Sequence, residues 1–254
     1  MRMYYLKITL KPHWGFLINY FGFTKSRPAI KIIPPTTLIG ALAFSLNLGK
    51  GEVYNDYSAA EKIRRIFKGI HLKVDTPLLE YNDLNRVVFY KVREKKIVSD
   101  AVAVGKIYSV PVGYLKIIYL IDRNEARNIL GEEWFKELIV SAWSICRIGA
   151  RESIVSVVDV EASKAEIIDD KFVKTSFYFP LRASDEQCLR GEFIIFNVID
   201  WTSYPIGDYT LAPKIPVVFP YSESKMKSSE VETKLKKGYK AVNAGGDIII
   251  PWRM

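Results

Sequence analysis

Residues 32–42 read IIPPTTLIGAL, and this stretch sets where the first helix of the chain begins. Its Pro-Pro pair prevents a helix from extending backwards, because proline lacks a backbone N–H and its ring clashes with the preceding turn. Beyond the pair, Gly49 is a typical helix stop, and apolar residues recur on one face at Leu38, Leu42 and Leu46. The pattern predicts a helix over residues 37–48.

The segments next to this helix are predicted to be a strand, a short helix and a hairpin. Residues 3–10 are rich in β-formers and predict a strand. Ser58 and Glu61 form a capping box, which predicts a short helix that ends near residue 67. Two extended segments, 78–92 and 105–121, are joined by the polar stretch REKKIVSDA and predict a long hairpin.

A second long helix and a strand follow the hairpin. Asp122 and Glu125 form another cap-like pair, and apolar residues recur at helical spacing towards Arg147, at Leu130, Trp134, Leu138, Ala142 and Ile145. Residues 152–162, ESIVSVVDVEA, alternate as a strand does. Without the short capped helix, the order is strand, helix, strand, strand, helix, strand. This order predicts an α+β, ferredoxin-like domain in which two helices cover one face of a four-stranded antiparallel sheet.

The prediction leaves the other face of that sheet available, as in many RNA-binding modules. We place this domain at residues 1–162 and a β-rich C-terminal subdomain at residues 163–254. Four short strands are expected in the second part, at FVKTSFYFPLR, EFIIFNVID, KIPVVFPY and DIIIPW. Because no Gly/Ser linker separates the two parts, we expect them to share an interface. Residues 222–240 are the best candidate for a mobile loop.

Basic residues are concentrated at the N-terminus. The net charge is +9, and the chain has no acidic residue before Glu52. The cations before that point alternate with aromatic residues, at Trp14, Phe16, Tyr20, Phe21 and Phe23. Cations suit phosphates and aromatic faces suit unstacked bases, so one interpretation is a surface for single-stranded nucleic acid. The alternative is a buried aromatic core with solvated lysines, as in many thermophile proteins.

Several classes of function lack support in the sequence. The two cysteines, Cys146 and Cys188, lie 42 positions apart without a CxxC pair, which argues against a disulfide framework or a zinc site and fits a reducing cytoplasm. We expect no targeting or membrane segment. No metal-binding, cofactor-binding or nucleophile motif is present, so we expect no metal, no cofactor, no small-molecule substrate and no catalytic residue.

The two histidines have different surroundings in the sequence. His71 lies between Ile70 and Leu72, where a histidine is usually a packed residue. His13 lies in the acid-free, aromatic N-terminal stretch, where it could accept a proton from an RNA 2′-hydroxyl or be an ordinary surface histidine.

The start of the first helix is a candidate anion site. The free N–H groups of its first turn, with the hydroxyls of Thr36 and Thr37, are expected to project from a fixed end. Three cations lie upstream, at Lys25, Arg27 and Lys31. A threonine N-cap over a buried helix is the alternative. Gly40 is unfavourable inside a helix, so we expect another backbone, of the sheet or of a ligand, to approach it closely.

Two of these stretches resemble one known family. SRPAIKIIPPTTLIGALAFSLNLG, residues 26–49, resembles the first-helix signature of the Cas-five family of CRISPR-associated RAMP proteins. RIGARESIVSV, residues 147–157, is similar to the LGxRE turn of that family, here Gly149, Arg151 and Glu152. The length and the β-rich C-terminal part look most like the archaeal type I-A branch.

The resemblance implies a non-catalytic subunit that binds crRNA in a type I Cascade complex of antiviral defence. Family members hold the five-prime handle of the crRNA, cap the backbone filament of Cas7-type subunits beside a large Cas8-type subunit, and extend a hairpin thumb over the RNA. Here the thumb would be residues 84–111. The predicted RNA-binding residues are Lys25, Arg27, Lys31, Thr36, Thr37, Arg86, Lys91, Arg93, Lys95, Lys96, Lys106, Arg147, Gly149 and Arg151.

Three alternatives stay open. In the type I-C branch a related protein is a metal-independent endoribonuclease that cleaves repeat RNA with Tyr, Lys and His side chains, and this chain has Lys11, His13 and Tyr20 but no adjacent Lys-His pair. The chain could also be a basic adaptor that binds only protein. Finally, the hairpin cations could be solvated without touching RNA.

Overall fold

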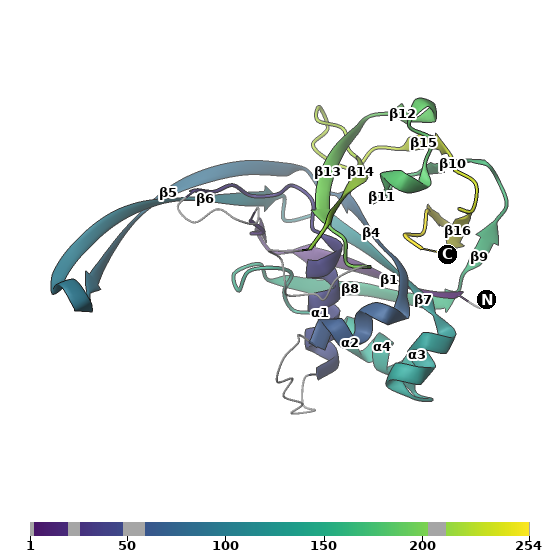
Figure 1. Cartoon of the computed structure of the whole chain (residues 1–254), viewed down its shortest axis with the longest axis horizontal. Coiled ribbons are helices and arrows are strands. Elements are labelled where there is room, and N and C mark those ends of the chain that lie inside the picture. The colour runs from purple at the N-terminus through teal and green to yellow at the C-terminus, as the bar shows by residue number, and fades with distance from the viewer. Residues whose placement is uncertain (1–2, 20–25, 48–58, 203–211, 254) are drawn as a thin grey trace.

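A four-stranded antiparallel sheet lies at the centre of the computed structural model, which describes residues 3–19, 26–47, 59–202 and 212–253 (Figure 1). Its strands lie in the order β4 (Phe67–Asp75), β7 (Tyr114–Asp122), β1 (Met3–Pro12) and β8 (Val155–Lys164). β1 therefore pairs with the last strand of the sheet on one side and with β7 on the other. The molecule is a strand-rich mixture of α and β, so the α+β prediction is confirmed at this level.

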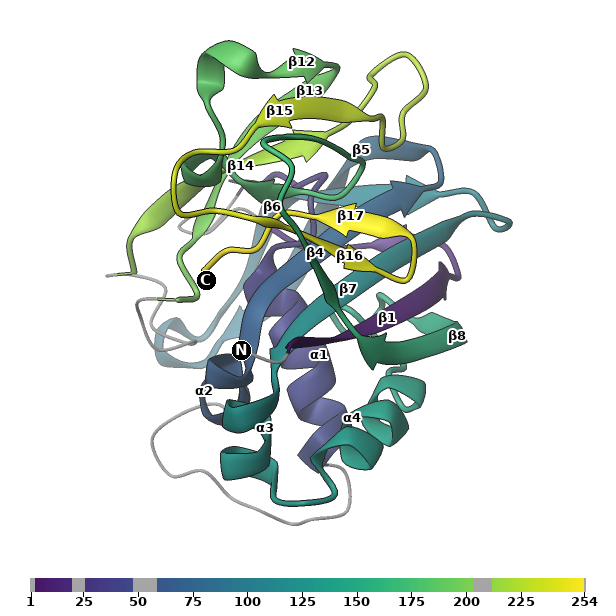
Figure 2. The ribbon, with the colours of Figure 1, turned by 90° about the vertical axis from the view of Figure 1, so that its right-hand side faces the viewer.

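Helices cover one face of this sheet (Figure 2). They are α1 (Pro35–Asn47), α2 (Ala59–Ile63), α3 (Arg123–Leu130) and α4 (Trp134–Trp143), with a short 3-10 turn at Arg64–Ile66. Leu6 and Ile8 of β1 pack in the same buried apolar cluster as Leu38 of α1 and Leu138 of α4. None of the helices in the described ranges is long and apolar enough to cross a membrane.

The predicted helix start after the Pro-Pro pair is confirmed to within two residues, and so is the cap at Asp122. The Asp122 carboxylate accepts hydrogen bonds from the backbone N–H groups of Asn124 (2.9 Å) and Glu125 (3.4 Å). The single helix predicted from there towards Arg147 is wrong, because Gly131, at φ +85°, ends α3 and a new helix begins at Trp134. The proposed cap at Ser58 lies outside the described residues.

The second face of the sheet is not available, and this expectation is wrong. β16 (Ala241–Ala244) and β17 (Asp247–Ile249) form a small sheet with β9 (Glu166–Ile168) and lie over β1 and β7 (Figure 2). Buried side chains of both layers form one apolar cluster, which includes Tyr5, Ile118, Leu120, Val242 and Ile249. The cause is that β1 and β7 carry apolar residues on both faces, so two layers are needed to cover them.

The C-terminal part contains the four expected strand regions. They hold β10 (Phe172–Thr175), β11 (Phe179–Pro180), β13 (Phe193–Ile199), β14 (Lys214–Pro220) and β17. Between them lie β12 (Arg190–Gly191) and two 3-10 turns, Leu181–Ala183 and Glu186–Cys188. The main apolar cluster includes Tyr178, Val217, Phe219 and Trp252, so the two parts share one core, as expected. The boundary at residue 162 stays a prediction.

The mobile loop predicted at residues 222–240 is wrong for its second half. β15 (Val231–Lys234) lies there and pairs with β10 on one side and β12 on the other. Val231 and Thr233 are fully buried, so the charged residues of this stretch alternate with inward-facing ones.

A long hairpin extends away from the body of the molecule (Figure 1). Its strands are β5 (Leu78–Lys91) and β6 (Lys96–Ser109), with a 3-10 turn at Val92–Glu94. A hairpin is present as predicted, but its second strand is wrong: residues 96–101 of the expected polar connection belong to β6, and the predicted segment 105–121 is divided between the end of β6 and β7. The strand next to β7 in the central sheet is β4, not the predicted 78–92. Lys95, at φ +48°, makes the turn tight enough for Lys91 and Lys96 to pair directly. At the base, β2 (Gly15–Phe16) and β3 (Ser26–Arg27) pair with β6.

Candidate nucleic-acid interface

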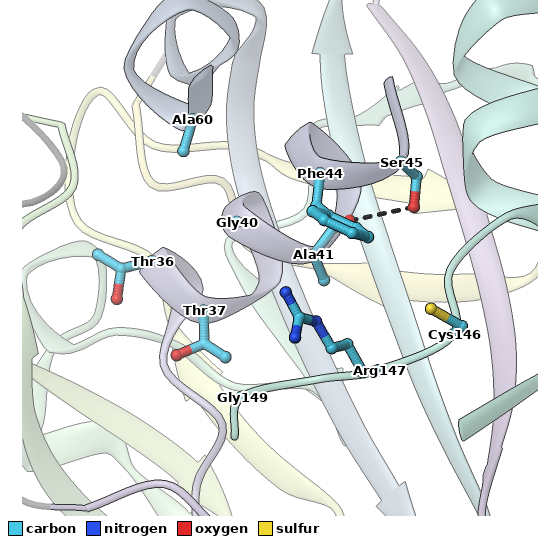
Figure 3. A pocket seen from close by; sticks show the side chains of 10 residues that line it. All are labelled: Thr36, Thr37, Gly40, Ala41, Phe44, Ser45, Ala60, Cys146, Arg147 and Gly149. Carbon is cyan, nitrogen blue, oxygen red and sulfur yellow. Dashed lines mark hydrogen bonds between the residues drawn. The ribbon is translucent and has the colours of Figure 1, made fainter. Parts of the chain in front are cut away.

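The first helix and the RIGARES turn, residues 147–153, meet at one pocket of about 270 Å³. α1 contributes Thr37 and Phe44, and the turn region contributes Arg147 and Gly149, about 110 positions later in the chain (Figure 3). The remaining lining residues are Thr36, Gly40, Ala41, Ser45, Ala60 and Cys146. The two stretches singled out in the sequence thus form one place on the surface.

Arg147 supplies the positive charge of this pocket. Its guanidinium lies 4.7 Å from the centre of the Phe44 ring, a cation–π contact that orients the side chain beside α1. Of the described residues that line the pocket, Arg147 is the one that carries a charge. The first turn of α1 contains no acidic residue, so the positive end of the helix dipole adds to the same potential.

The start of α1 offers fewer free donors than expected. The Pro34 carbonyl accepts hydrogen bonds from the N–H groups of Thr37 (3.0 Å) and Leu38 (3.2 Å), so these two are already used. Thr36 keeps only 6% of its surface exposed, whereas Thr37 is half-buried at the pocket. Contact with a ligand would therefore come mainly from Thr37 and Arg147.

Gly40 has an unexpected environment. A Cβ built on Gly40 would meet no heavy atom of the described residues within 4 Å outside its own helix turn. The expectation that the sheet backbone approaches this glycine closely is therefore wrong. The glycine instead lines the pocket, and the other alternative, close approach of a ligand, stays a prediction.

Gly149 is required by the fold of the turn itself. It has φ +88°, and a Cβ there would lie 2.9 Å from Ile18 Cγ1 and 3.0 Å from the Leu17 carbonyl oxygen. The Ala150 N–H also donates to Leu17, at 3.2 Å. The motif glycine therefore lets the turn approach residues 17–18, whatever else it contacts.

Arg151 lies on the other side of this turn. It lines a second pocket, of about 760 Å³, together with Lys106 at the base of the hairpin. Both arginines are predicted RNA-binding residues and Arg151 is the one in the family motif, but Arg147 is the one that lies beside the helix. The turn reverses the chain between these residues, so they point into different pockets.

The hairpin cations divide into paired and unpaired groups. The Glu94 carboxylate forms salt bridges with Lys96 (Oε2 to Nζ, 2.7 Å) and Lys91 (Oε1 to Nζ, 3.1 Å), and both contacts lower the pKa of this carboxyl. Lys106 pairs with Asp83 at 3.3 Å. Arg86, Arg93 and Lys95 are exposed, and no ion pair of theirs is recorded within the described residues.

Replacing Arg93 and Lys95 together with alanine should lower the slope of log affinity against log salt by roughly 0.7 for each lost phosphate contact with single-stranded RNA. Fluorescence anisotropy with labelled RNA at several salt concentrations measures this slope. Lys174 and Lys240, exposed lysines of the C-terminal part, provide a matched double alanine control. A slope that falls equally in both double variants would show that only net charge matters.

The remaining predicted positions are less well placed. Lys25 lies outside the described residues, as does the side chain of Arg27. Lys31 is half-buried and is not among the residues that line either pocket. His13 is exposed, with its Nε2 2.8 Å from the Ser156 hydroxyl. Within the described ranges, no group of three His, Cys, Asp or Glu side chains is arranged to hold a metal ion.

Sequence reasoning missed two features of this surface. One is the contact between Phe44 and Arg147. Its only sign in the sequence is an aromatic residue in a helix that we expect to be buried. The other is an aromatic set at the hairpin base, Trp14, Tyr81 and Tyr108, whose members come from three segments. Strand register joins them, and register is not visible in a single sequence.

Known proteins resemble the chain along nearly its whole length. No family model matches it. A Saccharolobus solfataricus protein named CRISPR system aCascade subunit Cas5 1 is 29% identical, with 98% of this chain and 99% of the relative aligned, and CRISPR-associated protein Cas5 3 of the same organism is 27% identical over the same shares. A crystal structure of a CRISPR protein from Archaeoglobus fulgidus matches with a TM-score of 0.65 at 21% identity, covering 99% of this chain and all of that one, which shows the same fold. These relatives, which carry the Cas5 name and align along nearly the whole chain, confirm the resemblance to the Cas-five family.

Proposed function

We propose that this protein is a non-catalytic crRNA-binding subunit of a type I-A Cascade complex, in which it holds the five-prime handle of the crRNA. The observation that carries the proposal is the meeting of α1 and the RIGARES turn at one cationic pocket. Full-length similarity to a protein named as an aCascade subunit supports the type of complex.

A ferredoxin-like first domain is part of this proposal. Its support is the sheet order β4-β7-β1-β8, with every neighbouring pair antiparallel and with α1 connecting β1 to β4. Along the chain these are the second, third, first and fourth strands of the sheet, which is the strand order of a ferredoxin-like βαββαβ domain. Because the C-terminal strands cover the second face, RNA would bind at the end of α1 and along the hairpin.

The pocket suits a phosphate of a bent single strand. The Arg147 guanidinium can donate two hydrogen bonds to phosphate oxygens, and the Thr37 hydroxyl lines the same pocket. Gly40 leaves room for the ribose or phosphate to approach the helix backbone. The handle would then continue past Gly149 towards the second pocket and the hairpin.

The exposed apolar surface of the hairpin supports the proposal that other subunits bind to it. It carries exposed apolar side chains on both strands, among them Leu84 (71% exposed), Val88 (63%) and Ile97 (73%). A two-stranded ribbon with such a surface gains stability from a neighbour. We assign Cas7-type and Cas8-type subunits as these neighbours, in a complex that acts in the cytoplasm.

The proposal of a non-catalytic subunit is supported by the surroundings of His13. A general base must lie within reach of the hydroxyl it deprotonates and needs an acid opposite. His13 instead lies beside the Ser156 hydroxyl. Lys11, two residues before His13, is part of strand β1 in the central sheet.

Expression in a cell that also transcribes a CRISPR array tests the function. The protein should co-purify with small RNA of one defined five-prime end, and that RNA should stay intact for hours in EDTA. Protein without bound RNA would contradict the proposal. Discrete products ending in a 2′,3′-cyclic phosphate, lost in His13→Ala, would favour the endoribonuclease alternative.

In the same test, Gly40→Ala should raise stability and weaken RNA binding. Alanine is favoured over glycine inside a helix by about 1 kcal/mol, and among the described residues outside its own helix turn the new methyl group would meet no heavy atom within 4 Å. It would project into the pocket, so RNA affinity should fall at least about fivefold. Thermal unfolding and anisotropy measure the two effects. Higher stability with unchanged affinity would remove this pocket from the RNA site.

A further inference from the structure

The second pocket lies between the base of the hairpin and the RIGARES turn. β6 contributes Val104, Lys106 and Tyr108 to its lining, and β5 contributes Asn85. The other lining residues are Trp14, Leu17, Asn19, Ala150, Arg151 and Glu152. Its volume, about 760 Å³, is large enough for a nucleoside and its phosphate.

One wall of this pocket is aromatic and rigid. The Trp14 and Tyr108 rings meet edge-to-face with centres 5.6 Å apart, and Tyr81 meets Tyr108 in the same way at 6.0 Å. The Trp14 indole N–H donates to the Glu152 carbonyl at 2.6 Å, and the Ser109 N–H donates to the Trp14 carbonyl at 2.9 Å. Tyr108 still exposes 37% of its surface, so an aromatic face is prepared and partly uncovered.

The other walls carry the polar groups that a base and a phosphate require. Asn85 is exposed and presents its amide, and Asn19 also lines the pocket, although its Oδ1 is buried and has no hydrogen-bond partner among the described residues. Arg151 is exposed at the rim, whereas Lys106 is held by Asp83. An amide has both a donor and an acceptor, which matches the edge of a nucleobase.

We infer that this pocket binds one unstacked nucleobase of single-stranded RNA, with the ring stacked on Tyr108 and the phosphate at Arg151. The inference rests on the proposed function and deepens it, because it separates base contact at the hairpin base from phosphate contact at α1. A stacked base is held without regard to its identity, whereas the asparagines can favour one edge.

Tyr108→Leu tests the inference, because leucine keeps the apolar volume of the strand but loses the flat ring. Its affinity for a labelled decauridine should fall at least about tenfold, at an unchanged salt slope, because a base contact and not a phosphate contact is lost. Its affinity for a decamer of abasic residues, which keeps the phosphates, should equal that of the wild type. Arg151→Gln should instead lower the slope with both decamers.

Trp143→Leu is the matched control, since Trp143 is 50% exposed on α4 and does not line this pocket. It should bind both decamers as the wild type does. If Tyr108→Leu weakens both decamers equally, or neither, the base site is overturned while RNA binding stands. Wild-type protein that binds no uridine, adenosine or cytidine decamer would overturn the proposed function, and this inference with it.

Discussion

Replacing Gly15 with alanine is expected to destabilise the protein by about 3 kcal/mol or more and to loosen the base of the hairpin. Gly15 has φ +145°, and a Cβ there would lie 1.8 Å from the Ile107 carbonyl oxygen and 2.9 Å from Tyr108 Cα. These are backbone atoms of β6, so no flexible side chain can move aside. Strand pairing at Gly15 and Tyr108 must break, which adds to the strain of a positive φ. Urea unfolding followed by circular dichroism measures the loss.

The control for this substitution is Gly238→Ala. Gly238 also has a positive φ, +93°, but a Cβ there would meet no heavy atom within 4 Å. It should therefore show only the cost of the backbone conformation, about 1 kcal/mol. An equal loss of stability in the two variants would contradict the close approach of β2 to β6. Because Trp14 precedes Gly15, the folded fraction of Gly15→Ala should also bind decauridine more weakly.

Local signals in the sequence predicted several elements of the fold but not β4, which lies between the expected short helix and the expected strand 78–92. The Pro-Pro pair and the Asp122 cap act on the backbone within a few residues, so their consequences can be inferred without tertiary structure. Gly131 was a local signal too, but the apolar periodicity continues through it and suggested one helix. Residues 222–240 were misread because charge was counted without the alternation that buries Val231 and Thr233.

The covered face of the sheet shows what composition can indicate and what it cannot. β7 reads YLKIIYLID, an almost continuous apolar run, and such runs are typical of strands buried on both sides. This signal was sufficient to predict a second layer. It could not identify β16 and β17 as that layer, because their contact with β1 depends on how distant segments pack.

The candidate site was predicted in its segments but not in its geometry. α1 and the RIGARES turn do come together, and Gly149 has the positive φ that a turn glycine allows. Which arginine faces the helix depends on the direction of the chain through the turn. Arg147 and Arg151 lie four positions apart, and a reversal between them sends one to each pocket.

His71 makes the stability of the protein depend on pH. Its ring is fully buried, with Nδ1 3.0 Å from the Tyr178 carbonyl oxygen and with no recorded hydrogen bond at Nε2 in the described part of the chain. Burial lowers the pKa of His71 to about 4, and the hydrogen bond to the Tyr178 carbonyl acts in the opposite direction. The unfolded chain has the ordinary pKa of about 6.5. Protons therefore bind the unfolded state first as the pH falls.

The contribution of neutral His71 to the free energy of unfolding should accordingly be complete above about pH 6.5. The free energy of unfolding should fall by about 2.5 kcal/mol between pH 7 and pH 4.5. Contacts with Lys7 and Tyr5 lower the pKa of the Glu161 carboxyl, so this group also loses stability as the pH falls, but mostly below pH 4.5, because the unfolded carboxyl titrates at about 4.3. His71→Gln, which cannot take up a proton, should lose this dependence even if it is less stable at pH 7. His13→Gln is the matched histidine control, and it should keep the dependence because it leaves His71 in place. Urea unfolding at pH 7, 6, 5 and 4.5 makes the comparison, and a wild-type slope that persists in His71→Gln would place the titrating group elsewhere.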